Sequence, residues 1–324
     1  MRRRAIAAFA LVLAAGAIAG RAHAAGVLDR VRSAGMVRCG AEERPGIASM
    51  GEDGRISGLA VDLCRAVAIA VLGPGARIGF RIYDSARDFD AVRQGREDVE
   101  FLTGAAIADH TLTDRIVPGP TVFIEPIALM VPDASPAHRV EDLSGKTICL
   151  MIGSDAQRAL EAAADRLGLS FARLTFEEDV EMLDAYNVQR CQAVAGETTS
   201  LATMRRASGI NRLASRLLTQ PLALFPIIAA TGTADGKWSA LVAWVIDALL
   251  LADGPPNGWQ ASGAGSLPLT AGAFGLQAHW QSEVEASTGS YATMIRRNLT
   301  RGLGLEPGPN ALWPDGLFLV PSAN

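Results

Sequence analysis

The residues whose chemistry is easiest to interpret are the four cysteines, Cys39, Cys64, Cys149 and Cys191. None of them forms the close pairs that bind structural zinc. An even number of cysteines in an exported chain favours disulfide bonds, and four cysteines allow three pairings, between which spacing alone does not choose. Pairing of nearest neighbours would place one disulfide early in the chain and one in its middle, as expected of two separately folded lobes.

The first 24 residues have the pattern of a secretory signal peptide. Three arginines at 2–4 precede an apolar run over 5–20, and Ala22-His23-Ala24 offers small residues for cleavage after Ala24. The run is about 16 residues long, whereas a membrane-spanning helix needs about 20. We therefore expect export to the periplasm. Without the four arginines of this segment the chain keeps 26 Lys and Arg against 34 Asp and Glu. Such an acidic protein is a poor nucleic-acid binder.

Strands alternate with helices in two successive halves of the chain, which predicts βαβ units and mainly parallel sheets. The first half has strands at 36–39, 78–82 and 99–102 with helices at 59–72 and 86–95. The second has strands at 147–152, 171–175 and 193–195 with helices at 156–167, 180–186 and 199–206. One extended stretch, at 122–131, lies between the halves, and another, at 222–229, follows the second half. Helices at 238–251 and 291–302 come after it. We expect an α/β protein of two Rossmann-like lobes joined by a two-strand hinge. We expect the chain to be divided into a signal peptide over 1–24, lobe 1 over 25–125 and 222–324, and lobe 2 over 126–221.

Motifs of catalysis are scarce in this chain. There is no phosphate-binding glycine loop followed by lysine, no His-Glu-x-x-His and no nucleophile elbow. The exported part has three histidines, His110, His138 and His279, of which only His110 lies near the expected cleft. No serine is assigned to complete a triad with it. We therefore expect no enzyme, no cofactor and no metal.

Several segments resemble the periplasmic solute-binding proteins of amino-acid ABC transporters, in particular the general L-amino-acid-binding branch. They follow the family order over nearly the whole exported chain, and all four cysteines fall on family positions. The resemblance implies a type II periplasmic binding protein fold, ligand capture by hinge closure, and the disulfides Cys39 to Cys64 and Cys149 to Cys191. The segments are Val37 to Gly40, Gly58 to Ala68, Lys146 to Cys149, Arg190-Cys191, Gly289 to Tyr291, Arg297 to Leu299, Asn310 to Trp313 and Gly316-Leu317.

The resemblance also implies a ligand clamp, in which an arginine of the first lobe grips the ligand carboxylate and an acid of the second lobe holds the ammonium. Glu197 is at the position of that acid. Ser154 and Asp155 match the turn whose helix amino end meets the carboxylate, although the negative charge of Asp155 is unfavourable there.

The first-lobe part of the clamp departs from the family. The family arginine falls on His110, whose imidazole lacks the forked donors of a guanidinium. A shifted alignment would instead place Arg115 in the clamp. His110 is otherwise a metal ligand together with Asp109, or a surface residue. Asp62 borders the cleft, where we expect it to orient a loop more than to bind ligand.

These observations favour the substrate-binding component of an ABC transporter, a monomer that takes an amino acid or related small polar solute to a permease in the inner membrane. Two alternatives stay open. The divergent clamp fits a degenerate accessory protein that no longer binds amino acids. A dehydratase-like enzyme on the same fold would use His110 and Glu197 as acid and base.

Overall fold

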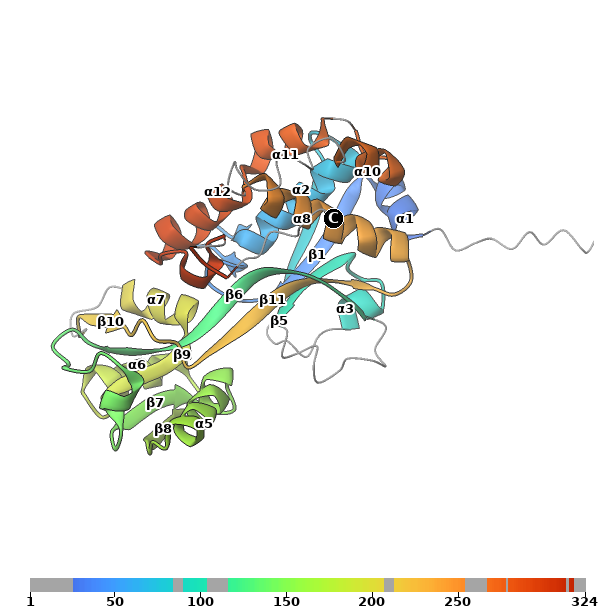
Figure 1. The fold of residues 1–324 in the computed structure, drawn as a ribbon. Helices are drawn as coiled ribbons and strands as arrows, with labels where there is room; N and C mark the ends of the chain where they lie inside the picture. The colour runs from blue at the N-terminus through green and yellow to red at the C-terminus, as the bar shows by residue number, and fades with distance from the viewer. Residues whose placement is uncertain are drawn as a thin grey trace, which may run out of the picture.

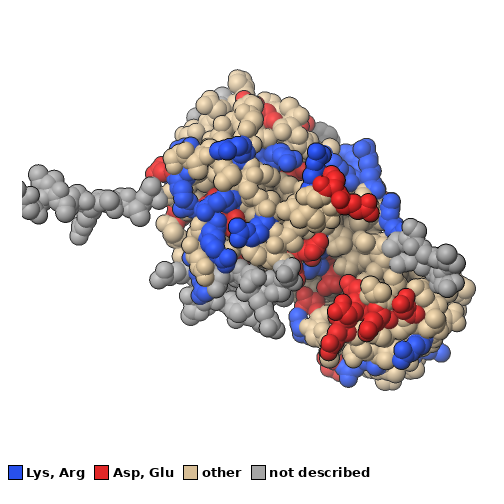
Figure 2. Space-filling model, turned by 180° about the vertical axis from the view of Figure 1, so that it is seen from behind, with Lys and Arg blue, Asp and Glu red and all other residues tan. Residues whose placement is uncertain are grey.

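In the computed structural model, two α/β lobes are joined by two long strands, as the sequence predicts (Figure 1). The structure describes residues 26–83, 90–103, 116–206, 213–253, 267–277, 279–312 and 315–317. Seen from the other side, the molecule has two unequal bodies with a hollow where they meet (Figure 2).

Lobe 1 is built on three parallel strands in the order β4 (Arg77–Tyr83), β1 (Met36–Glu42) and β5 (Val99–Thr103). The strand β11 (Ala223–Gly232) lies antiparallel to β5 and to β6 (Ile116–Pro132). The helices of this lobe pack around the sheet, and most of them contribute to one large apolar core. They are α1 (Val27–Ala34), α2 (Leu59–Leu72), α3 (Asp90–Arg93), α8 (Gly236–Ala252), α10 (Leu267–Phe274), α11 (Trp280–Thr288) and α12 (Tyr291–Ile295).

The helix predicted at 59–72 is α2, the most enclosed helix of lobe 1. Eleven of its 14 residues are buried, so it packs on several sides. Cys64 of α2 is bonded to Cys39 of β1, with 6.3 Å between their Cα atoms. This is the first of the two disulfides that the family resemblance implies, and it ties the helix to the central strand.

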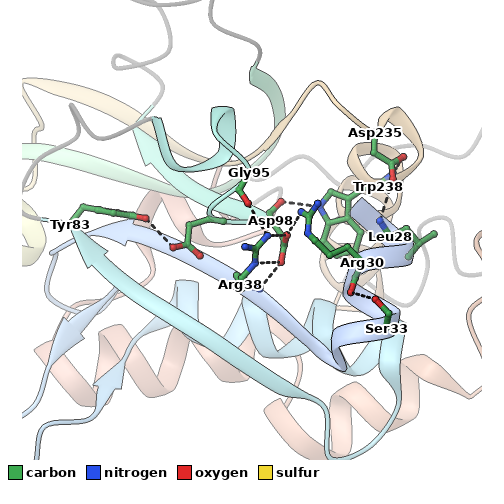
Figure 3. A network of polar contacts seen from close by, with 10 residues as sticks. Leu28, Arg30, Ser33, Arg38, Tyr83, Gly95, Asp98, Asp235 and Trp238 are labelled. Atoms are coloured by element: carbon green, nitrogen blue, oxygen red, sulfur yellow. Dashed lines mark hydrogen bonds and ion pairs between the residues drawn. The ribbon is translucent and has the colours of Figure 1, made fainter. Parts of the chain in front are cut away.

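A buried carboxylate, Asp98, fixes the beginning of β1 beside β5 (Figure 3). Its oxygens accept from the backbone and guanidinium of Arg38 at 2.7 to 3.2 Å and from Arg30 at 2.7 Å. Its backbone carbonyl accepts from the indole nitrogen of Trp238, which is fully buried, at 2.8 Å. One residue therefore connects β1, α1 and α8.

Lobe 2 has three parallel strands in the order β9 (Ala193–Glu197), β7 (Thr147–Met151) and β8 (Ala172–Phe176). The helices α5 (Asp155–Leu167), α6 (Asp179–Asn187) and α7 (Thr198–Arg206) each follow one of these strands, which is the predicted βαβ order. Apolar clusters lie on both faces of the sheet. The second disulfide, Cys149 to Cys191, lies within this lobe.

The hinge consists of β6 and β11, which run through both lobes. β6 pairs with β11 over 116–127 and with β9 over 127–130, so its partner changes at Ile127. The short strand β10 (Ser215–Leu217) pairs with the far end of β6. The lobe boundaries that we propose, at 125/126 and 221/222, fall at or next to these two strands.

Two of the predicted helices differ clearly in extent from the structure. The predicted helix at 86–95 is described from Asp90 onward, where α3 has four residues. The predicted helix at 291–302 is α-helical over α12 only, and a π-helical turn continues it through Arg296–Arg301. In the described part of the chain, no helix has the length and apolar character to cross a membrane.

Candidate functional site

Polar side chains of lobe 2 gather where its parallel strands end. Ser154 and Asp155 follow β7, Asp179 follows β8, and Glu197 is the last residue of β9. The carboxyl ends of parallel strands lie at one edge of a sheet, beside the amino ends of the following helices, and ligands of α/β proteins bind there. In Figure 2, acidic side chains gather on lobe 2 and in the hollow between the lobes.

Ser154 caps helix α5, and its hydroxyl is engaged on both sides. The hydroxyl donates to the carbonyl of Met151 at 2.7 Å and accepts from the backbone nitrogen of Gln157 at 3.2 Å. Asp155 makes an ion pair with Arg158, one turn along the helix. Ser154 thus shapes the turn as an N-cap, while Asp155 keeps a partly exposed carboxylate on the wall of the cleft.

The facing wall of lobe 1 is a tight turn after β1 that carries Arg44. The backbone nitrogens of Arg44 and Ala48 each donate to the other residue's carbonyl, at 2.8 and 2.9 Å. The carbonyls of Gly46 and Ile47 accept from the first backbone nitrogens of α2, both at 2.9 Å. The turn is thus fixed on the amino end of α2.

Gly58, immediately before α2, permits this close approach. It has a φ of +139°, and a Cβ atom there would lie 2.2 Å from the carbonyl oxygen of Ile47. Glycine alone fits such a contact with such a backbone. The position of Arg44 therefore depends on a residue fourteen positions further along the chain.

The guanidinium of Arg44 lies among carboxylates from three strands. Its nitrogens are 3.6 Å from Glu42 of β1, 3.7 Å from Glu125 of β6 and 3.9 Å from Glu197 of β9. The Arg44 side chain is only 10% exposed, and its pKa is raised by these acids, although burial opposes the charge. The cluster thus joins lobe 1, the hinge and lobe 2 at the base of the cleft.

Glu125 is the fully buried carboxyl of this cluster. Its carboxylate is buried, and it accepts from the backbone nitrogen of Thr199 at 3.2 Å and from the Thr199 hydroxyl at 2.8 Å. Burial raises its pKa to about 7, while Arg44 and the bonds from Thr199 oppose the shift. The carboxyl is therefore close to half protonated at neutral pH.

Two further acids at the cleft have raised pKa values. Burial raises the pKa of Glu42, and Glu197 and Asp155 add to the effect, against the attraction of Arg44. Burial likewise raises the pKa of Asp179, with contributions from Glu197 and Glu178. These raised pKa values reflect burial of the carboxyl groups first and the neighbouring carboxylates second.

The structure brings only some of the predicted site residues together. Glu197 and the Ser154-Asp155 turn lie on one wall, as expected. Asp62 instead accepts from Arg297 and Asn298, both at 2.7 Å, and so ties α2 to the helical segment near the end of the chain. His110 and Arg115 lie outside the described residues.

Sequence reasoning missed Arg44 and Glu125. Both carried a signal: Arg44 stands before Pro45-Gly46 directly after the first strand, where parallel-sheet ligands are bound, and Glu125 is the one charged residue in the apolar run 122–131. A charge in a strand that is otherwise apolar needs a buried partner. Identifying that partner required the tertiary structure.

Known proteins are similar to this chain over almost its whole length. YhdW of Escherichia coli O157:H7, which carries the name of an amino-acid ABC transporter-binding protein, is 24% identical over 333 residues, covering 98% of this chain and 97% of that protein. The general L-amino acid-binding periplasmic protein AapJ of Rhizobium johnstonii is 27% identical over 327 residues, covering 95% and 94%. The chain is a homologue of amino-acid ABC transporter-binding proteins. No model of a known protein family matches it.

A solved structure agrees with this homology. An ABC transporter periplasmic binding protein of Brucella ovis, with glutathione bound, has a TM-score of 0.71 at 23% identity, covering 90% of this chain and 97% of that chain. At this identity the likeness establishes the fold. The binding-protein homologue described here thus has the type II periplasmic binding protein fold that the sequence led us to expect.

Proposed function

We propose that this protein is the substrate-binding component of an ABC transporter and captures an amino acid or a related small polar solute between its lobes. The homologous binding proteins support the transport role. The main support for a site in the cleft is that three charged side chains meet at its base: Arg44 of lobe 1, Glu125 of the hinge and Glu197 of lobe 2. A solute placed there touches both lobes and the strand on which they turn, so binding and closure are coupled.

In this proposal the solute lies against Glu197, Ser154 and Asp155 of lobe 2, and His110 or Arg115 completes the wall of lobe 1. Asp62 supports the cleft through its bonds to Arg297 and Asn298. The protein works in the periplasm as a monomer, delivers the solute to an inner-membrane permease, and performs no chemistry on it.

The screen that tests this function measures the melting temperature of the mature protein with amino acids, amines, small acids and glutathione. Glutathione is included because it is bound in the similar Brucella ovis structure. A solute at 100 times its dissociation constant adds about 2.7 kcal/mol to the free energy of unfolding. We expect at least one solute to do so, with one-to-one binding in calorimetry.

The accessory role is the second candidate, because the guanidinium of Arg44 is paired with carboxylates of lobe 1, the hinge and lobe 2. If no solute in the panel stabilises the protein, the accessory role replaces the transport role. Turnover of a solute without a stable complex would instead identify the dehydratase-like enzyme.

A further inference from the structure

Arg44 and Glu197 form an ion pair between the two lobes at the place where a solute is expected. The guanidinium belongs to the turn after β1 in lobe 1, and the carboxylate to the end of β9 in lobe 2. Their closest nitrogen and oxygen atoms are 3.9 Å apart. The Glu197 side chain is 24% exposed, so a solute can reach it. A cationic group that binds Glu197 must therefore enter next to the positive charge of Arg44.

Arg44 is held in place by its backbone and side-chain contacts, so moving it would break several of them. The backbone of Arg44 makes two hydrogen bonds with the backbone of Ala48, and the turn between them accepts hydrogen bonds from the amino end of α2. A Cβ atom at Gly46, two residues further along, would lie 3.0 Å from side-chain atoms of both Leu299 and Leu303, so the turn is also packed from behind. Glu42 and Glu125 keep the guanidinium paired even when Glu197 turns away.

The balance of charge around Arg44 also disfavours an anionic solute group at this point. Three carboxylates lie within 4.0 Å of one guanidinium, and burial together with neighbouring acids raises the pKa values of Glu42 and Glu125. Because Arg44 already has three acidic partners, an anionic solute group would have to displace one of them. Arg44 is therefore placed to oppose a solute cation rather than to attract a carboxylate.

We propose that Arg44 determines the selectivity of the cleft. Its guanidinium is a counter-ion fixed to the chain, and it competes with solute cations for Glu197. It therefore weakens the binding of every solute that presents a cationic group there. This inference rests on the proposed function, since it assumes that solutes enter the cleft. It predicts that cation affinity rises when the charge of Arg44 is removed.

The test uses calorimetry with two matched pairs of probes, 1,4-diaminobutane against 1,4-butanediol and 1-aminobutane against 1-butanol, in which only the first member of each pair carries ammonium groups. In Arg44→Gln, we expect both cationic probes to bind at least about tenfold more tightly than in the unchanged protein, with the neutral probes altered less than about threefold. Arg44→Lys keeps the charge and should keep the weak binding. Arg139→Gln removes one exposed arginine of lobe 2 outside the cluster, 68% exposed, and controls for net charge.

A double substitution assigns the effect to the pair. Adding Glu197→Gln to Arg44→Gln should abolish the gain, because no carboxylate of lobe 2 is then released. If Arg44→Gln does not fold, Arg44→Met, which keeps much of the length of the side chain without its charge, replaces it with the same probes and the same expected gain; a diamine affinity unchanged within about threefold would overturn the proposal.

The outcomes separate the two proposals. Stabilisation of the unchanged protein by a solute, without a gain for cations in Arg44→Gln, refutes the selectivity role and leaves the transport function standing. A gain for cations in Arg44→Gln, when no solute binds the unchanged protein, supports the selectivity role and refutes the transport function. An equal gain in Arg139→Gln would refute the role of Arg44.

Discussion

Replacing Glu125 by glutamine should change how the stability of the protein depends on pH. Burial raises the pKa of the folded carboxyl to about 7 from an ordinary value of 4.5. Because the folded state holds this proton more tightly than the unfolded state, the contribution to stability is fully present below pH 4.5 and is lost as pH rises to 7. Glutamine does not titrate, so it removes this dependence.

The size of the effect follows from the two pKa values. Each pH unit between them costs about 1.4 kcal/mol, so the Glu125 carboxyl loses roughly 2 kcal/mol of stabilisation between pH 5 and pH 8. The free energy of unfolding of Glu125→Gln, relative to the unchanged protein, should therefore rise by that amount over this range. The amide oxygen of the glutamine still accepts from one of the two Thr199 donors, which in the native protein bond to different oxygens of Glu125 at 2.8 and 3.2 Å.

Urea unfolding of both proteins at pH 5, 6, 7 and 8 measures this difference. Glu52→Gln, at an exposed position, controls for the loss of one carboxylate. A difference between Glu125→Gln and the unchanged protein that stays constant from pH 5 to pH 8, or that falls as pH rises, would refute the assignment of a raised pKa to Glu125.

Three other variants test the scaffold that positions the site. Asp98→Asn leaves two arginines facing a neutral amide and should lower the free energy of unfolding by about 3 kcal/mol in urea titrations; a loss below about 1 kcal/mol would contradict the role of this network. Replacing Cys149 and Cys191 together by serine should lower the free energy of unfolding by about 2–4 kcal/mol. Peptide mapping of the unchanged protein without reduction should find the Cys149–Cys191 disulfide and no disulfide between the lobes. Gly58→Ala should lower the melting temperature by several degrees, at roughly 4 °C or less per kcal/mol in a chain of this size, because the new methyl group meets the carbonyl of Ile47; an unchanged melting temperature would show that the turn adapts freely.

The sequence by itself determined the architecture of this protein. Strand and helix periods of 2 and 3.6 residues are local properties, so they located the central strands, α2, α5 and the two hinge strands. The capping residue Ser154 marked where α5 begins. The order of motifs and the positions of the cysteines indicated the resemblance to amino-acid ABC transporter-binding proteins, which in turn implied the two disulfides.

Only the tertiary structure decided which charges meet in the cleft. Glu42, Glu125 and Glu197 are separated by more than seventy residues at each step, yet all three lie within 4.0 Å of one guanidinium. No periodic pattern encodes such a meeting, because it depends on how three strands are ordered in space and on the approach of a turn that Gly58 permits. The same holds for the pKa of Glu125, since burial and neighbouring charge set it, and both arise only when the lobes and the hinge are folded together.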